Sequence, residues 1–259
     1  MMTRTDWLAR HPYLQPLADI HGAVDAALET ADVPAAGVPI WDRYVAEFQR
    51  GVPLLQSGMS PLDQRATAEA CAALLRTLTR SPLPGRLADE CEELAAALGR
   101  ADSELSLMSS GLLHLVGWAI VERHLEEVLT VFARWRDEER WRRNYCPMCG
   151  AAPAMAQLVG VEPGRIRWLS CGCCRTRWQY PRTGCPFCEP QDDHRVLVLG
   201  IDGEDGLRLD YCERCRGYLK TYNGSGEEAV LLADWTSIHL DFIARGRGLK
   251  RMAASLYAF

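Results

Sequence analysis

Apolar residues recur at three- and four-residue spacing through the first 143 residues, in segments dominated by Ala, Leu, Glu and Arg. This spacing gathers apolar side chains on one face of a helix, and these residue types favour helical backbone. The pattern predicts an all-helical region with helices at 22–31, 40–50, 61–79, 86–98 and about 103–143. Ser60 is expected to cap the third helix, with Pro61 in its first helical position, and Gly99 is expected to end the fourth.

The last of these helices contains a stretch without formal charge, residues 105–121. The stretch has only 17 residues, three of which are serines, whereas a membrane-spanning helix needs about 20 predominantly apolar residues. We therefore predict a buried core helix and no membrane span. The helix should begin at Asp102 or Ser103 and bend near Gly111 or Gly117, because glycine weakens helical backbone.

After residue 144 the pattern changes to short alternating runs with frequent turn residues. Alternation predicts strands at 165–169, 195–199 and 207–211. A first hairpin should pair 155–160 with 167–169 around Glu162-Pro-Gly164, and a second should turn at Asp202-Gly203 and Asp205-Gly206. Residues 227–245 return to helical spacing and are apolar enough to dock on the rest of the chain. The pattern as a whole predicts an α+β fold that ends in a C-terminal helix.

Eight of the eleven cysteines form four Cys-x-x-Cys pairs, namely Cys146/Cys149, Cys171/Cys174, Cys185/Cys188 and Cys212/Cys215. The first two pairs are separated by 21 residues and the last two by 23. Two thiolates two residues apart reach one metal ion from a tight turn, here called a knuckle. A second knuckle across a hairpin completes the tetrahedron. The spacing therefore predicts two tetrathiolate sites of the structural zinc or rubredoxin-type iron kind.

We predict that the knuckles are used in sequence. The first site then comprises Cys146, Cys149, Cys171 and Cys174, and the second comprises Cys185, Cys188, Cys212 and Cys215. An interleaved pairing stays open, because spacing does not exclude it. Glycine after Cys149 suits a positive φ in the first knuckle. A site with four thiolates has no open coordination position, which argues against metal catalysis.

The three remaining cysteines lie outside these pairs. Cys173, inside Cys171-Gly-Cys173-Cys174, is either a free thiol that points away from the metal or an alternative ligand or redox-responsive thiol. Cys71 and Cys91 occur among Ala and Leu on predicted helices and are expected to fill the core.

Disulfides are the main rival interpretation of the cysteines, and they require an oxidising compartment. No apolar stretch of signal-peptide length follows the first residues, and Arg4 is not part of an Arg-Arg pair. A thioredoxin-like site would be a single pair in a βαβ unit. The chain is therefore expected to be cytoplasmic, with its thiolates held by metal. A net charge of −5 and nearly balanced charge across 145–222 predict no nucleic-acid partner.

Catalytic groups are sparse in this sequence. His114 and His124 lie ten residues apart on a predicted helix and so face different directions. His239 and Asp241 alternate within an apolar segment and do not form a dyad. The sequence has no Gly-rich phosphate loop and no Gly-x-Ser-x-Gly elbow. These features predict a protein that is not an enzyme.

Several motifs resemble the formate dehydrogenase accessory (formation) proteins, the FdhE family. These motifs are Cys146-Pro-Met-Cys-Gly-Ala-Ala-Pro153, the later knuckles, Gly217-Tyr-Leu-Lys220, His11-Pro-Tyr-Leu14 and Gly51-Val-Pro-Leu-Leu55. The resemblance implies a cytoplasmic factor that acts on the catalytic subunit of a molybdenum- or tungsten-dependent formate dehydrogenase. It also implies rubredoxin-like knuckles that hold iron. Arg216, where a rubredoxin-type knuckle carries glycine, and the extra Cys173 depart from the pattern.

Pattern and resemblance together predict a helical domain (1–143), a first four-cysteine ribbon (144–182), a second ribbon (183–224) and a C-terminal helical segment (225–259). The ribbons should be small rubredoxin-like or zinc-ribbon β modules with two metal ions, iron or zinc. The expected function is a non-catalytic maturation factor for formate dehydrogenase. The alternatives are a thiol-redox or sulfur-relay enzyme that uses Cys173 and a zinc-ribbon protein associated with nucleic acid. The oligomeric state stays open, with a homodimer as one alternative.

Overall fold

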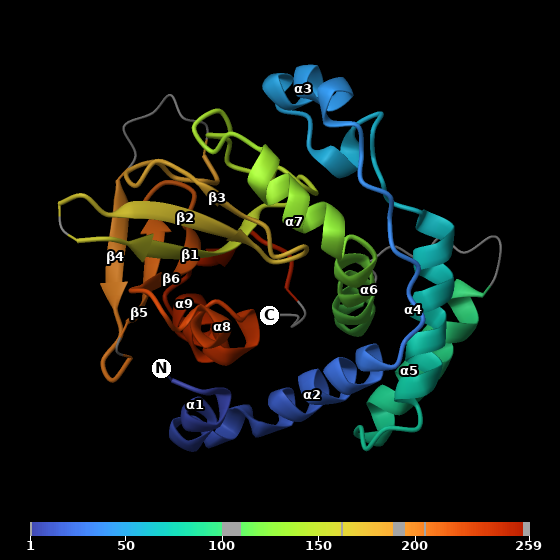
Figure 1. Cartoon of the computed structure of the whole chain (residues 1–259). Helices are drawn as coiled ribbons and strands as arrows, with labels where there is room; N and C mark the ends of the chain where they lie inside the picture. Colours follow the sequence, from blue (N-terminus) through green and yellow to red (C-terminus); the bar gives the residue numbers. More distant parts are fainter. Residues whose placement is uncertain (1, 100–109, 162, 189–194, 205, 256–259) are drawn as a thin grey trace.

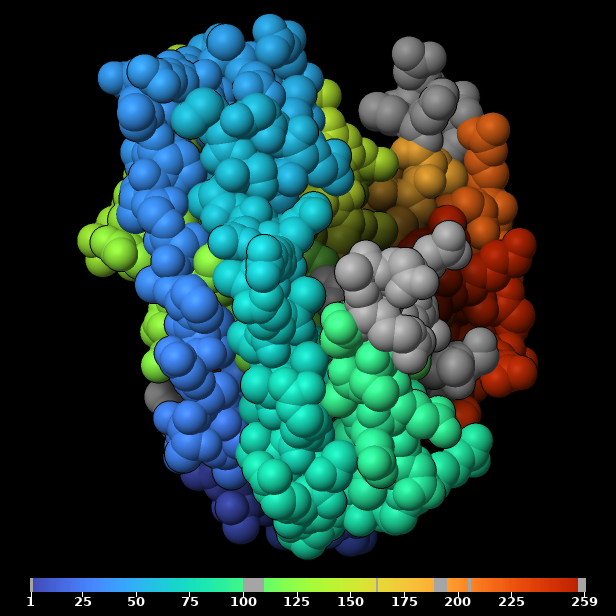
Figure 2. All heavy atoms as spheres, turned by 90° about the vertical axis from the view of Figure 1, so that its right-hand side faces the viewer, coloured from blue at the N-terminus to red at the C-terminus, as the bar shows by residue number. Residues whose placement is uncertain are grey.

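The computed structural model describes residues 2–99, 110–161, 163–188, 195–204 and 206–255. Its N-terminal half is helical. The helices are α1 (Arg4–Arg10), α2 (Gln15–Glu29), α3 (Trp41–Arg50), α4 (Gln64–Leu78), α5 (Gly85–Leu98), α6 (Gly111–His124) and α7 (Glu126–Trp135). Two short 3₁₀ turns, η1 (Pro12–Leu14) and η2 (Leu54–Gln56), interrupt the connections. Figure 1 shows the sheet on the left, α2 along the bottom and α4 and α5 on the right. The helices α4 and α5 form much of the surface that faces the viewer in Figure 2.

Two predicted helix starts, those of α4 and α2, were wrong. The helix α4 begins after Asp63, whose carboxylate accepts a hydrogen bond from the N–H of Ala66. Asp63 therefore caps this helix, and Ser60 does not. Gly99 ends α5 as expected. The helix predicted at 22–31 is the second half of the longer α2.

The predicted long helix is divided into α6 and α7. The division lies at Leu125 and not at Gly111 or Gly117, where a bend was predicted. Glu126 and Glu127 in the first turn of α7 favour a new N-terminus there, because the helix dipole attracts negative charge. Ser110 caps α6 by accepting from the N–H of Leu113. The start expected at Asp102 or Ser103 lies outside the described residues. Within the described ranges, no helix is both long enough and apolar enough to cross a membrane.

One mixed sheet follows the helices. Its strands are β1 (Pro153–Val159), β2 (Ile166–Cys171), β3 (Arg177–Gln179), β4 (Val196–Gly200), β5 (Leu207–Cys212), β6 (Gly217–Asn223) and β7 (Lys250–Arg251). The strand order is β3-β2-β1-β6-β5-β4, and β7 pairs with β6. The two predicted hairpins are β1–β2 and β4–β5, both antiparallel. Parallel pairing of β1 with β6 joins the two ribbons into one continuous sheet. Glu162 and Asp205, expected in the turns, lie outside the described residues.

The mixed fold therefore agrees with the predicted α+β class. The continuity of the sheet across both ribbons was not predicted. Strands β3, β6 and β7 were not predicted, because each is short or contains buried polar residues. The strand β6 is an example: Lys220 and Thr221 are both fully buried in it.

Hydrophobic packing crosses the expected domain boundary at 143/144. One cluster lies entirely among α2, α4, α5 and α6 and includes Cys71 and Cys91. A second joins α3 and α7 to the first knuckle and β2. A third joins α1 and α2 to β5, β6 and α9 (Ile238–Gly246). The division into four domains stays a prediction, but two of these three clusters connect the helical region to the sheet.

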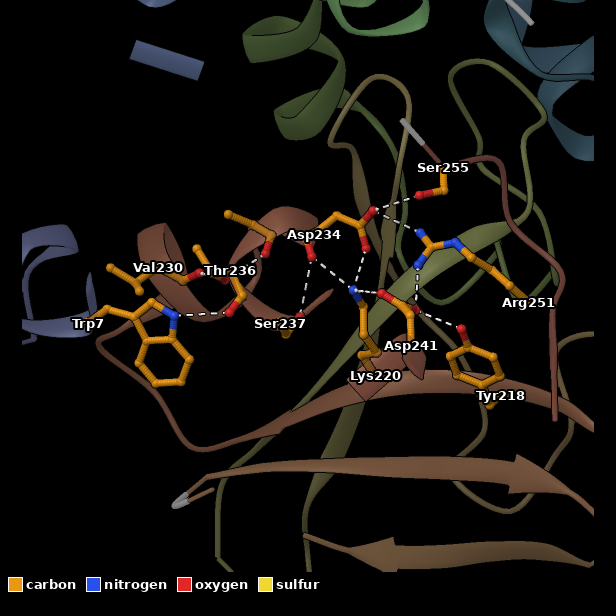
Figure 3. A network of polar contacts seen from close by, with 11 residues as sticks. Trp7, Tyr218, Lys220, Val230, Asp234, Thr236, Ser237, Asp241, Arg251 and Ser255 are labelled. Atoms are coloured by element: carbon orange, nitrogen blue, oxygen red, sulfur yellow. Dashed lines mark hydrogen bonds and ion pairs between the residues drawn. The ribbon is translucent and has the colours of Figure 1, made fainter. Parts of the chain in front are cut away.

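A buried network of charged side chains attaches the C-terminal segment to the sheet (Figure 3). This segment comprises α8 (Glu228–Leu231), η3 (Asp234–Ser237) and α9. Lys220 Nζ lies 2.6 Å from Asp234 Oδ1 and 2.8 Å from Asp241 Oδ2. Arg251 bridges the same two carboxylates, at 2.9 Å and 2.7 Å. Tyr218 donates a hydrogen bond to Asp241 at 2.6 Å. Tyr218 and Lys220 of the Gly-Tyr-Leu-Lys motif thus hold α9 and η3 on β6.

Candidate metal centres

The structure brings the thiols of Cys146, Cys149, Cys171 and Cys174 together between the first knuckle and the end of β2. Three of the sulfur–sulfur distances are 3.5, 3.5 and 3.7 Å. Four sulfurs at about 2.3 Å from one ion lie about 3.8 Å apart at the corners of a tetrahedron. A disulfide would require about 2.05 Å, and all eleven cysteines are free thiols. The first cluster therefore has the dimensions of a tetrathiolate site.

Residues of the helical region hold the first knuckle in place. The N–H groups of Leu54 and Leu55 in η2 donate to the carbonyls of Pro147 and Met148, at 3.0 and 2.8 Å. The amide of Gln56 donates to the carbonyl of Cys149 at 3.0 Å. These three hydrogen bonds make residues 54–56 a cradle for the knuckle, which sequence reasoning did not find. They give a physical role to the Gly51-Val-Pro-Leu-Leu55 motif.

Gly51 ends α3 with φ = 84°, a left-handed conformation that favours glycine. A Cβ atom there would lie 1.9 Å from the Arg143 side chain. The carbonyl of Gly51 accepts a hydrogen bond from the hydroxyl of Tyr145 at 2.7 Å, directly before the first knuckle. The turn after α3 therefore positions both the cradle and the residue that enters the knuckle.

The second cluster gathers Cys185, Cys188, Cys212 and Cys215 where β5 ends and β6 begins, along the same edge of the sheet as the first cluster. Two sulfur–sulfur distances are 3.8 and 3.7 Å, again close to a tetrahedral edge. Cys188 and Cys215 are half-buried, whereas in the first cluster only Cys149 is. Tyr180 donates a hydrogen bond to the carbonyl of Cys185 at 3.2 Å. The second cluster is thus the more exposed of the two.

Knuckle backbone geometry suits metal-bound thiolates in both clusters. N–H groups two residues beyond a cysteine point at its sulfur, at 3.4 Å for Cys171 and at 3.3 Å for both Cys185 and Cys215. Such donors stabilise negative charge on the sulfur. Gly150 has the expected positive φ of 81°. Arg175 and Arg216 occupy the equivalent position after their knuckles with φ of 52° and 61°, which is unusual for residues other than glycine.

Burial raises the pKa of the Cys146 and Cys185 thiols, because a buried anion loses its hydration. A divalent or trivalent cation among the four sulfurs offsets that cost and displaces the protons. Each cluster could therefore hold one metal ion, with ligands supplied only by cysteine. Zinc and iron both suit this donor set.

Cys173 lies next to the first cluster and outside its four-thiol group. Its Sγ is 4.0 Å from His114 Nε2 on α6, and both side chains are buried. Both line a cavity of about 430 Å³ between α6, β2 and η3, with Trp118, Glu122 and Arg175 among the other lining residues. The proximity of His114 was missed, since nothing in the spacing of residues 114 and 173 indicates a contact.

The other sequence candidates have structural positions. Cys71 and Cys91 fill the helical core as expected, and burial raises their thiol pKa values to about 12 and about 11. His124 accepts a hydrogen bond from the N–H of Asp63 at 3.3 Å, so it connects α6 to the start of α4. Asp241 belongs to the buried charge network and forms no dyad with His239.

Comparison with known proteins relates this architecture to one named group. The chain is 31% identical over 185 residues to the FdhE homolog of Pseudomonas aeruginosa, an alignment of 66% of this chain and 57% of that protein. It is 28% identical over 174 residues to Protein FdhE of Escherichia coli O157:H7, covering 66% and 55% of the two chains. It is 28% identical over 141 residues to the FdhE homolog of Aquifex aeolicus, covering 52% and 50%. The chain is similar to FdhE proteins. The resemblance found in its motifs is confirmed.

The crystal structure of the FdhE protein from Pseudomonas aeruginosa has the same fold, with a TM-score of 0.58 at 22% identity. The match covers 90% of this chain and 84% of that one. In sequence, the chain spans only 50 to 57% of the length of these FdhE relatives. No protein-family model matches it.

Proposed function

We propose that this protein is a non-catalytic accessory factor for the maturation of a formate dehydrogenase, and that it acts by binding the catalytic subunit. The observation that carries the proposal is the pair of four-cysteine clusters, which lie along one edge of a single sheet, one in each half. Similarity to FdhE proteins supports the same function.

The clusters suit a binding role more than a chemical one. Four protein thiolates fill the coordination sphere of a metal ion and leave no position for substrate or water. In the proposed state, Cys146, Cys149, Cys171 and Cys174 hold one ion, and Cys185, Cys188, Cys212 and Cys215 hold the other. The ions fix the knuckles as rigid loops, which a partner can recognise without ordering them first. Iron, which the family resemblance implies, or zinc would serve this purpose.

The proposal is tested by deleting the gene in its host and measuring formate dehydrogenase activity, messenger RNA and protein. We expect activity to be lost while the message persists, because the factor acts on a protein. Complementation with the full chain should restore activity, and Cys149→Ser or Cys188→Ser should not. Cys71→Ala, a core cysteine outside both clusters, is the matched control and should restore it. Normal activity in a deletion strain without a second copy would refute the proposal.

Direct binding is tested by co-purification with a tagged catalytic subunit of formate dehydrogenase. The wild-type chain should be retained, and the purified protein alone should not oxidise formate. Retention of the two cluster variants at the wild-type level would contradict a role for the knuckles in binding.

A second candidate function is thiol-redox or sulfur-relay chemistry at Cys173. The contact between the Cys173 thiol and His114 at the edge of a cavity favours it, because an imidazole can take the proton of a neighbouring thiol. Burial of the Cys173 side chain opposes it, since a relay thiol must meet its partner. Alkylation distinguishes the two functions. A rapidly modified Cys173, together with inactive Cys173→Ser protein in which both four-cysteine clusters still hold their ions, would favour chemistry over binding.

A further inference from the structure

Three potential metal ligands from distant parts of the chain meet beside α9. They are His11 at the C-terminal end of α1, Glu204 in the turn between β4 and β5, and His239 on α9. Glu204 Oε1 lies 3.1 Å from His11 Nε2 and 2.7 Å from His239 Nε2. The side chains are only 10%, 9% and 17% exposed for His11, Glu204 and His239. Figure 1 places α1, the β4–β5 turn and α9 in the same corner of the molecule.

The hydrogen bonds of His11 direct a lone pair toward Glu204. Its Nδ1 lies 3.1 Å from the carbonyl oxygen of Trp7, which can only accept, so Nδ1 carries a proton. In neutral imidazole the other nitrogen, Nε2, is then a bare acceptor, and it faces a carboxylate oxygen. Two acceptors at this distance repel each other unless a second proton on the imidazole or a metal ion lies between them. A backbone carbonyl on the second nitrogen is also the usual support of a metal-binding histidine.

His239 contacts the same carboxylate oxygen, because its Nε2 lies 2.7 Å from Glu204 Oε1. Both ring nitrogens of His239 are buried, and among the described residues neither has a hydrogen bond of standard geometry. The close contact between Nε2 and Oε1 requires a proton or a metal ion between the two atoms. Ligand atoms about 2.1 Å from a common ion lie about 3.0 to 3.4 Å apart in octahedral or tetrahedral geometry. The 3.1 Å separation between His11 Nε2 and Glu204 Oε1 falls in that range, and the 2.7 Å separation at His239 is about 0.3 Å shorter than its lower limit.

The surroundings hold the three side chains rigidly and leave one side open. The ring of Trp7 stacks on His11 with centroids 4.0 Å apart, and its Nε1 donates to the carbonyl of Thr236 at 2.9 Å (Figure 3). Tyr13 lies edge-on to both imidazoles and is 56% exposed. The site is therefore preformed and lies beneath a solvent-exposed ring.

We propose that His11, Glu204 and His239 form a third metal site, which takes a divalent first-row transition ion such as Zn²⁺ or Fe²⁺. Two imidazoles and one carboxylate are a donor set common to both ions. The described part of the chain supplies three protein ligands at this site, which leaves at least one coordination position for water or an exogenous ligand. This open N/O site differs in kind from the closed thiolate clusters, and it does not rest on the proposed function. The ion also ties the N-terminal helix to the sheet and α9.

Metal counting tests the site directly. The full chain is dialysed to equilibrium against a fixed low-micromolar free Zn²⁺ concentration under reducing conditions, and zinc per chain is measured by mass spectrometry. We expect three ions in the wild type and two in Glu204→Gln, which keeps the shape of the side chain and removes its charge. The matched control is Asp202→Asn, an exposed carboxylate two residues away on the same turn, which should bind three.

Two results would overturn the proposal: a wild-type ratio of two, which needs no variant to fold, or a ratio of three in Glu204→Gln. The first would leave the three residues as a hydrogen-bonded ion pair. Far-UV circular dichroism checks that Glu204→Gln is folded. If this variant is unfolded, His239→Gln replaces it in the experiment and should also bind two ions. With zinc in the thiolate clusters, added Co²⁺ should give the absorption spectrum of an N/O site, without sulfur-to-cobalt charge transfer. This spectrum should be absent in Glu204→Gln and His239→Gln. A sulfur-to-cobalt band instead would contradict the assignment.

Discussion

The two four-cysteine clusters have the same ligand set and very different surroundings. Helical residues 54–56 form hydrogen bonds with the first cluster, which is packed in the hydrophobic cluster that contains Phe48, Phe132 and Trp141. The second lies in the other half of the sheet, where β5 ends and β6 begins, and two of its four cysteines are half-buried. Chemically equivalent sites can therefore contribute differently to the structure. The first is part of the interface between the helical region and the sheet, and the second organises the half of the sheet that contains β4, β5 and β6.

The largest expected difference comes from removing one equivalent ligand from each cluster. Cys149 and Cys188 are both half-buried and both close their knuckles. Each serine variant should lose one metal ion, and a structural ion contributes on the order of 10 kcal/mol to folding. Cys149→Ser should also disrupt the packing of the helical region, whereas Cys188→Ser should disturb mainly the half of the sheet that contains β4, β5 and β6. Metal content, far-UV circular dichroism and tryptophan fluorescence measure this. Equal loss of helical signal in both variants would contradict the claim that only the first cluster supports the helical region.

Chelation should remove the ions of the two four-cysteine clusters in order. The more exposed second cluster should release its ion first, with little change in tryptophan fluorescence. The first cluster should release its ion later, together with a large change in tryptophan fluorescence, because the fully buried Trp141 and Trp178 pack beside this cluster. Metal release followed by a chromophoric chelator and by fluorescence in parallel measures the order. Simultaneous release would mean that the sheet transmits the loss of one ion to the other.

Removing a central cation should destabilise the sheet near the second cluster without removing metal. Lys220→Met leaves Asp234 and Asp241 buried with only Arg251 as a cationic partner, which should cost about 3 to 5 kcal/mol. Burial raises the pKa of Asp234, but Lys220 and Arg251 outweigh it and lower the pKa to about 2.

The depressed pKa fixes the direction of the pH dependence. The contribution of Asp234 is present above its ordinary pKa of 3.8 and is lost as the pH falls through about 2. In Lys220→Met the loss should begin at a higher pH. Urea unfolding between pH 2 and 7 measures both effects, with Lys250→Met, an exposed lysine at the edge of the sheet, as the control. Unchanged stability in Lys220→Met would show that Lys220 in the buried charge network does not stabilise the fold.

The smallest expected effect concerns the residue after the second knuckle of each cluster. Arg216→Gly should stabilise the protein by about 0.5 kcal/mol at most, because glycine relieves the left-handed backbone but makes the unfolded chain more flexible and loses the exposed hydrogen bond from the Arg216 guanidinium to the carbonyl of Arg247. Arg175→Gly should give less or nothing. It removes the ion pair with Glu122, whose pKa burial raises to about 7 against the opposing effect of Arg175. Thermal unfolding measures both, and a larger gain for Arg175→Gly would contradict the ion-pair argument.

Local signals made part of the fold predictable. Helical periodicity located α3 and α5 closely, and alternation located the hairpins β1–β2 and β4–β5. The four Cys-x-x-Cys pairs indicated which thiols the structure later brings together. The N-terminal α1 escaped notice because it is short, although Thr3 and Asp6 form a capping box at its start. Helical periodicity predicts helix after Trp135, but the segment is irregular and contains a turn at 138–140, because Arg136 and Trp141 make tertiary contacts there instead.

The sequence by itself determined the ligands and the turns, because a knuckle is closed by residues within a few positions of one another. Only the tertiary structure decided which helical residues hold the first knuckle, that β1 and β6 join two ribbons into one sheet, and that Cys173 meets His114. It alone brought His11, Glu204 and His239 together, across 193 positions between the first two. Contacts between distant segments depend on how whole helices and strands pack, and spacing along the chain contains no signal for them.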